Sequence, residues 1–149
     1  MSNAKLREAF HAAGMRLTRQ RLLICRELAN RYDHPDVEKI HQAVRTRLKR
    51  ISLFTVYRTV NVLEQHGLAW RVTTWKGHAR YDGNTHAHAH FLCEECGRID
   101  DVDTQGACHE MAERAHECVP NRQVRRVDMM IIGTCEECLA TTGVPTDTP

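Results

Sequence analysis

Two Cys-x-x-Cys pairs, Cys93/Cys96 and Cys135/Cys138, constrain the fold of this chain more than any other feature of its sequence. Each pair places two sulfur atoms on one tight turn, and two such turns supply the four thiolates of a closed tetrahedral zinc site. Two disulfides or four unpaired core thiols are the alternatives. The seven cysteines are an odd number, and residues 1–10 lack the apolar stretch of a signal peptide, so we expect a cytoplasmic protein with reduced thiols. The pattern therefore predicts a structural Zn²⁺ with no catalytic role.

A histidine-rich stretch lies directly before the first pair. His86, His88 and His90 alternate with alanines, so in an extended strand the three side chains would point to the same face. Several imidazoles on one face suit a second metal site, separate from the zinc. The alternative is the half-buried face of an ordinary strand.

Charge is distributed very unevenly along the chain. Residues 1–81 carry 16 Lys/Arg against 6 Asp/Glu, a formal charge of +10, whereas residues 82–149 carry 5 against 13, a charge of −8. Such asymmetry favours a first half that binds a polyanion and a second half with another task. Two ordinary solvated surfaces are the alternative. No apolar run approaches the length needed to cross a bilayer, so we expect no membrane partner.

The first half shows helical spacing of apolar residues between capping residues and breakers. We expect helices over 5–13, from Thr18 to Asn30, from Asp36 into the basic residues 45–50, and from Ser52 to Gly67, and then two short strands, 68–72 and 79–81. The fourth helix has Leu53 in its apolar stripe and leaves Thr55, Tyr57 and Arg58 outside it, where they can reach bases and phosphates of a DNA major groove. A merely solvated polar face is the alternative. A basic hairpin after such a helix, with Arg71, Lys76 and Arg80 available for phosphates, is typical of a winged helix-turn-helix.

The second half has the pattern of a small α/β domain. Strands are expected over 86–92, 98–102 and 124–132, with a helix over 106–118. The predicted fold class is α+β, an N-terminal winged helix-turn-helix domain followed by a small α/β domain.

Five motifs together resemble one known family over nearly the whole chain, from about Leu6 to Leu139. They are RLTRQR at 16–21, TVYRT at 55–59, RYD at 80–82, HAHFLCEECGRI at 88–99 and GTCEEC at 133–138. The chain resembles the ferric uptake regulator (Fur) family of metal-dependent transcriptional repressors.

The resemblance implies a domain plan and two macromolecular partners. It implies a winged-helix DNA-binding domain over 1–82, a hinge over 83–86, a dimerisation and metal-binding domain over 87–140, and a flexible tail over 141–149. The partners would be a second copy of the chain, forming a homodimer, and double-stranded operator DNA with a palindromic sequence. The residues expected to contact DNA are Arg16, Thr18, Gln20, Arg21, Thr55, Tyr57 and Arg58.

The resemblance also implies a regulatory metal site for Fe(II) or Mn(II). The family's ligands, carried over position by position, are His34, Asp82, His88, His90 and Asp101. His86 stays undecided. Many iron-sensing members have glutamate where Asp101 stands, whereas peroxide-sensing members have aspartate at both carboxylate positions, so we expect a peroxide-responsive repressor. An iron-uptake regulator is the alternative, and a zinc-uptake regulator is a weaker one.

Two other classes fit the sequence less well. A zinc hydrolase or deaminase needs an open zinc with a nearby glutamate, as in His-Glu-x-x-His or His-x-Glu with Pro-Cys-x-x-Cys, and neither pattern occurs. A zinc-storage protein leaves the basic half unexplained. We therefore expect a regulator that is not an enzyme and has no small-molecule substrate.

Overall fold

The computed structural model describes residues 1–142, which divide into two compact units. The first unit covers Met1–Thr85 and the second begins at His86. Residues 143–149 of the predicted tail lie outside the described residues. None of the helices in the described part is long and apolar enough to cross a membrane.

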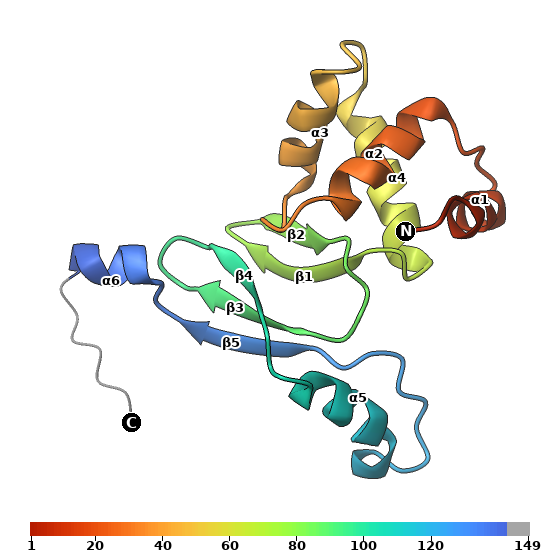
Figure 1. Ribbon diagram of the computed structural model, residues 1–149. Coiled ribbons are helices and arrows are strands. Elements are labelled where there is room, and N and C mark those ends of the chain that lie inside the picture. Colours follow the sequence, from red (N-terminus) through yellow and green to blue (C-terminus); the bar gives the residue numbers. More distant parts are fainter. Residues whose placement is uncertain (143–149) are drawn as a thin grey trace. The chain divides into compact units, whose positions relative to one another are not determined.

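The first unit begins with four helices, and each starts at the capping residue that its sequence provides. They are α1 (Asn3–Ala12), α2 (Arg19–Ala29), α3 (Val37–Arg45) and α4 (Leu53–Gln65) (Figure 1). Thr18, Asp36 and Ser52 each accept a hydrogen bond from a backbone N–H in the first turn of α2, α3 and α4, as their positions predicted. Ser2 caps α1 in the same way.

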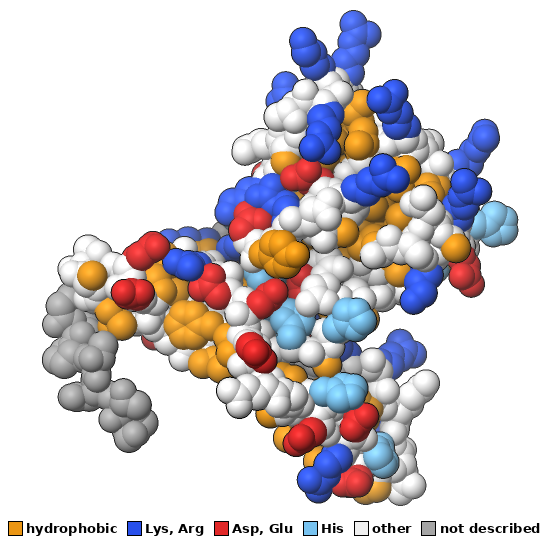
Figure 2. Space-filling view, viewed as in Figure 1, with side chains coloured by type: hydrophobic (Ala, Val, Ile, Leu, Met, Phe, Trp, Pro, Cys, Tyr) orange, Lys and Arg blue, Asp and Glu red, His pale blue; other side chains and the backbone are white. Residues whose placement is uncertain are grey.

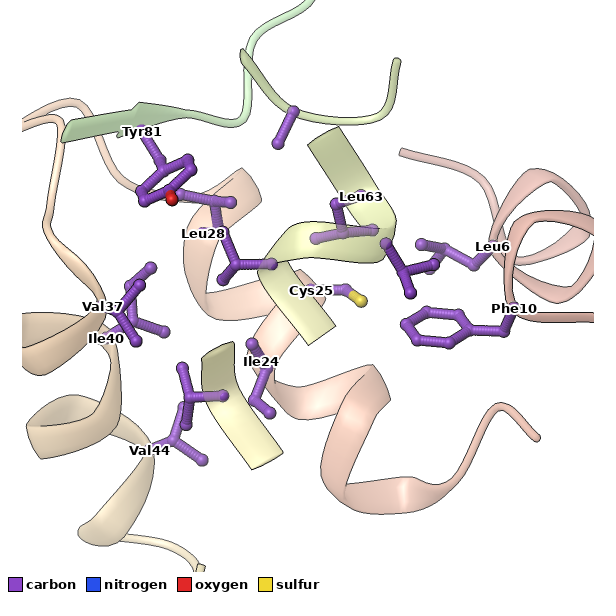
Figure 3. Close-up of a cluster of buried hydrophobic side chains, with 14 of the residues drawn as sticks. Leu6, Phe10, Ile24, Cys25, Leu28, Val37, Ile40, Val44, Leu63 and Tyr81 are labelled. Carbon is purple, nitrogen blue, oxygen red and sulfur yellow. The ribbon is translucent and has the colours of Figure 1, made fainter. Parts of the chain in front are cut away.

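These helices share one core, to which Tyr81 of the following hairpin also contributes. Figure 3 shows side chains of α1, α2, α3 and α4 converging, with Tyr81 closing one end. Leu53 was expected in the buried stripe of α4, but it is 37% exposed. It lies in the first turn of α4, and the buried residues of that helix begin only at Val56.

A β-hairpin follows α4 and is longer than the sequence predicted. Strands β1 (Trp70–Trp75) and β2 (His78–Asp82) pair antiparallel, from Trp70 with Asp82 to Trp75 with His78. The two residues of the turn, Lys76 and Gly77, both have positive φ. This is the conformation of a tight hairpin turn, and it lets the strands pair right up to the tip.

The second unit is a three-stranded sheet with two helices. Its elements are β3 (Ala89–Cys93), β4 (Ile99–Val102), α5 (Ala107–Cys118), β5 (Met129–Gly133) and α6 (Glu136–Thr142) (Figure 1). The strand order is β4-β3-β5, with β4 antiparallel and β5 parallel to the central β3. A parallel pair needs a crossover, and the chain makes it through β4 and α5.

Three sequence predictions in this unit differ from the structure. The strand expected over 86–92 begins only at Ala89, which pairs with Val102 and Met129, the terminal residues of both neighbouring strands. His86 therefore lies outside the strand. The strand expected over 124–132 is limited to Met129–Gly133 for the same reason, and α6 was not predicted.

Candidate metal centres and DNA-binding surface

The four cysteines of the two pairs meet at one end of the sheet and form a cluster that we call the zinc cluster. Cys93 ends β3, Cys96 closes the turn after it, and Cys135 and Cys138 lie before and within α6. Their sulfur atoms all lie within 4.8 Å of one another. The Sγ atoms of Cys96 and Cys135 are 3.8 Å apart, and the backbone N–H of Cys135 donates to Sγ of Cys93 at 3.3 Å.

This geometry fits Zn²⁺. Four sulfurs at the usual Zn–S length of about 2.3 Å in a tetrahedron lie about 3.8 Å from each other. Backbone N–H donation, above all from Cys96, lowers the pKa of Cys93 to about 6, whereas the hydrogen bond with Cys135 raises the pKa of Cys138 to about 12. Crowded sulfurs resist a second negative charge, and a bound divalent cation removes that resistance. With four protein donors the site is closed and therefore structural.

Two of the five predicted regulatory ligands, His34 and Asp82, lie together inside the first unit. His34 occupies the turn between α2 and α3 with a positive φ of 46°, and Asp82 ends β2. Both side chains are buried, and one ligand atom of each lies within 4.8 Å of the other. The Oδ1 atom of Asp82 also accepts the backbone N–H of Asn84 at 2.7 Å. A buried imidazole beside a buried carboxylate is a good pair of donors for a divalent cation.

Strand β2 holds the turn that carries His34. The guanidinium of Arg80 donates to the backbone carbonyl of His34 through Nε and to that of Asp33 through Nη2, the latter at 2.8 Å. The N–H of Tyr81 donates to the carbonyl of Pro35 at 3.0 Å. Arg80 is only 8% exposed, so the expectation that it contacts phosphates was wrong. Its guanidinium instead donates to two backbone carbonyls of a turn some 46 residues earlier in the chain. Sequence spacing does not reveal such a contact.

The other three predicted ligands, His88, His90 and Asp101, lie together in the second unit. His90 on β3 faces Asp101 on β4 in the strand register. The Nε2 atoms of His88 and His90 lie 3.3 and 3.7 Å from Oδ1 of Asp101, and the two imidazole rings are 4.4 Å apart. Two imidazoles and a carboxylate that converge in this way can hold a divalent cation.

His86, left undecided by its sequence, contributes through its backbone. Its carbonyl lies 2.8 Å from Nδ1 of His88. A carbonyl can only accept, so Nδ1 of His88 is the donor, and Nε2 is the nitrogen on the side of Asp101. Hydrogen bonds of this kind commonly orient histidine ligands of metal ions.

The outer face of α4 carries the residues expected to contact DNA. Tyr57 and Arg58 are exposed and Thr55 is half-buried, opposite the buried side of the helix. Phe54, directly before Thr55, is 68% exposed, although no sequence motif pointed to it. The end of α3 and the loop between α3 and α4 add four exposed cations. They are Arg45, Arg47, Lys49 and Arg50. Figure 2 shows Lys and Arg side chains gathered over this end of the first unit, at the top of the view.

The residues expected to contact DNA near the start of α2 divide into two kinds. Arg16 and Gln20 are exposed. Thr18 caps the helix by accepting the N–H of Arg21, and the Arg21 guanidinium donates to the carbonyl of Arg16 and lies over the Phe10 ring. These two residues therefore also shape the surface from which Arg16 projects.

Three more residues with nitrogen-bearing side chains lie on that surface. Arg7, His11 and Arg19 line an open hollow of about 410 Å³ together with Arg16. His11 follows Arg7 by one helical turn of α1, and this spacing could have indicated that both lie on one face.

Comparisons with known proteins agree on one family. The family model described as the ferric uptake regulator family matches residues 12–131. The peroxide-responsive repressor PerR of Staphylococcus epidermidis is 35% identical over 126 residues, 85% of this chain and 83% of that protein. PerR of Staphylococcus aureus is 36% identical over 137 residues, 92% of this chain and 88% of that protein. Among solved structures, the ferric uptake regulator Fur of Helicobacter pylori, described with three functional metal binding sites, has a TM-score of 0.71 and 27% identity and covers 91% of this chain and 89% of its own.

Proposed function

Because the chain belongs to the ferric uptake regulator family, we propose that it works as a homodimeric, metal-dependent repressor that releases its operator in response to peroxide. Members of this family regulate transcription, and the chain is a regulator rather than an enzyme. A protein that binds chromosomal DNA acts in the cytoplasm, which is also where thiols stay reduced.

The regulatory metal in this proposal is Fe(II) or Mn(II), held by His34 and Asp82 of the first unit and by His88, His90 and Asp101 of the second. Nitrogen and carboxylate donors suit these ions better than the softer sulfur set of the zinc cluster. A metal that takes ligands from both units binds best in the one arrangement that brings them together. Binding then shifts the equilibrium towards that arrangement, which is how a small ion can control DNA affinity.

The peroxide response follows from the donors as well. These residues would hold Fe(II), whose one-electron chemistry would cleave the O–O bond of hydrogen peroxide; overall, one oxygen would be inserted into an imidazole C–H bond, which supplies the two electrons, and the other would leave as water. The imidazoles of His88 and His90 would lie beside the iron, and an imidazole that gains an oxygen atom is a poorer ligand. The protein then loses the regulatory metal and with it the DNA-competent arrangement. The support for this reading is the aspartate at position 101 and the similarity to two PerR proteins.

Dimerisation is proposed to use the second unit. Strand β5 lies at the edge of its sheet, and Ile131 and Ile132 on it are 44% and 61% exposed. An exposed apolar edge strand is a surface that a second copy of the chain can cover. A two-fold dimer presents two copies of α4 and so matches a palindromic operator.

The observation that carries the proposal is the convergence of His88, His90 and Asp101, with Nε2 atoms 3.3 and 3.7 Å from one carboxylate oxygen. The test starts from protein purified without oxygen, with its metal content measured. Operator DNA is selected from a random pool, and its binding is measured with Fe(II) and with Mn(II), before and after hydrogen peroxide.

We expect peroxide to release DNA from the iron form while mass spectrometry finds oxygen added to a ligand histidine. The Mn(II) form is the control and keeps its DNA, because Mn(II) gives up electrons to peroxide far less readily. An iron form that keeps both its DNA and unmodified histidines contradicts the peroxide response. A protein with no metal-dependent preference for any duplex contradicts the repressor assignment.

The second candidate is an iron-responsive regulator of the Fur type. The similarity to the Helicobacter pylori Fur structure favours it. Under this alternative the iron form resists peroxide, and DNA binding follows the Fe(II) concentration alone.

A further inference from the structure

The start of α4 exposes several large hydrophobic side chains. Among residues 1–85, five large hydrophobic residues are exposed, and three of these, Leu53, Phe54 and Tyr57, lie within residues 53–57. Phe54 is the most exposed of the three at 68%. Isolated exposed hydrophobic residues are common, but a group at the start of one helix indicates a surface that something else covers.

Phe54 is held in place by its neighbours. The guanidinium of Arg58, one helical turn later, lies 5.8 Å from the centre of the Phe54 ring. Such a contact restricts both side chains and keeps the cation next to the apolar ring. The Oγ atom of Ser52, on the other side, lies 2.8 Å from the hydroxyl of Thr55, so the start of the helix is also fixed. The ring therefore projects from the start of a capped helix, next to a cation.

The positive charge around Phe54 favours a polyanion as the partner. The exposed side chains of Arg45, Arg47, Lys49 and Arg50 precede the helix, and Arg58 follows. A surface with this much positive charge complements a polyanion, and an apolar partner such as a membrane interior or a protein core would have to desolvate those cations. In DNA, the major groove offers one apolar group, the C5 methyl of thymine, which no other base carries.

We propose that Phe54 reads thymine: its ring packs on the C5 methyl of one thymine in each operator half-site, with Arg58 held beside it to reach the adjoining base or phosphate. This inference rests on the proposed DNA-binding function and adds to it one residue that sets operator sequence. The residues already expected to contact DNA, Thr55, Tyr57 and Arg58, leave Phe54 without a role. Because the Phe54 ring is exposed beside these residues, we assign it a role in base recognition.

The test uses the full-length protein loaded with Mn(II) and a duplex that it selects from a random pool. Each thymine is replaced in turn by deoxyuridine, which removes only the methyl group. Burial of one methyl contributes on the order of 0.8 kcal/mol, so we expect about fourfold weaker binding for one replaced half-site and roughly 15-fold for both. Phe54→Ala is expected to bind the thymine and uracil duplexes equally well.

Two controls make the result specific. Tyr32→Ala removes another exposed aromatic residue, 79% exposed and outside α4, and the ratio of thymine to uracil affinity should stay as in the wild type. Thermal unfolding of Phe54→Ala should match the wild type, because the ring is not part of the core.

Two outcomes overturn the inference. One is a wild type that tolerates uracil at every position, and the other is a uracil penalty that persists in Phe54→Ala, which assigns the methyl to another residue such as Tyr57. A wild type that selects no duplex at all overturns the proposed function itself, and that failure is seen before any base is replaced.

Discussion

The zinc cluster and the proposed regulatory ligands differ in how their residues are distributed over the two units. All four zinc ligands belong to the second unit and come from two short motifs. The proposed regulatory ligands are divided, with His34 and Asp82 in the first unit and the other three in the second. A metal bound within one unit stabilises that unit. A metal bound by both units would favour one arrangement of the units and so change the affinity for DNA. The two sites thus differ both in their donor atoms and in how their residues are distributed over the two units.

The largest effect is expected for the zinc cluster. Cys93→Ser removes the sulfur that accepts the N–H of Cys135. A structural zinc site contributes on the order of 10 kcal/mol, as much as the whole stability of a small domain, so the second unit should unfold and dimerisation should be lost. Zinc content, circular dichroism and native mass measure this.

The matched control is Cys118→Ser, which changes an exposed thiol of the same unit and should keep both zinc and dimer. A Cys93→Ser protein that stays folded without zinc would contradict the structural role of the cluster.

The next effect is expected at the regulatory ligands and should leave the fold intact. His90→Ala removes a buried imidazole that faces Asp101 in the sheet. Because a metal ligand is lost, Mn(II) affinity should fall by more than about 100-fold, with metal-dependent DNA binding lost and zinc content unchanged. Calorimetry with Mn(II) gives the affinity.

His109→Ala changes an exposed histidine on α5, where it pairs with Glu113, and should behave as the wild type. If His90→Ala instead lost zinc and unfolded, the two sites would not have separate roles.

Arg80 contacts the proposed ligand residue His34 through the backbone carbonyl of that residue. Arg80→Lys keeps the charge but not the fork that reaches the carbonyls of Asp33 and His34, so we expect about tenfold weaker Mn(II) binding. At saturating Mn(II), the salt dependence of DNA binding should not change.

The control is Arg71→Lys on the same hairpin, whose side chain pairs with Glu64 at the surface. A phosphate contact contributes about 0.9 to the slope of log affinity against log salt, whether the cation is arginine or lysine. The contact is therefore tested with the uncharged variant Arg80→Gln, in which a shallower slope would return Arg80 to the DNA surface.

The smallest effect concerns a thiol outside both sites. Burial in the core raises the pKa of Cys25 to about 12, so its thiolate is scarce at pH 8 and iodoacetamide should leave it unmodified in the folded protein. Mass mapping should find exposed Cys118 alkylated under the same conditions, and Cys25 only after unfolding. Rapid native alkylation of Cys25 would show that the core of the first unit opens readily.

Local sequence determined a large part of this protein. The helix starts at Thr18, Asp36 and Ser52 followed from capping residues, because a cap satisfies backbone N–H groups within one turn. The zinc cluster followed from the spacing of its two pairs, since each pair needs only a tight turn. The resemblance to a family named the regulatory ligands, but it could not supply the contacts that orient them.

Tertiary structure decided what depends on distant partners. Arg80 was read as a surface cation because nothing near it in sequence shows the two carbonyls that it binds. His86 was placed in a strand by its alternation with alanines, yet a strand extends only as far as its neighbours pair with it, and here they begin at Ala89. Phe54 became informative only once its exposure was known. Capping and ligand spacing are local interactions that sequence encodes directly, whereas burial, register and orientation arise from contacts made when the chain has folded.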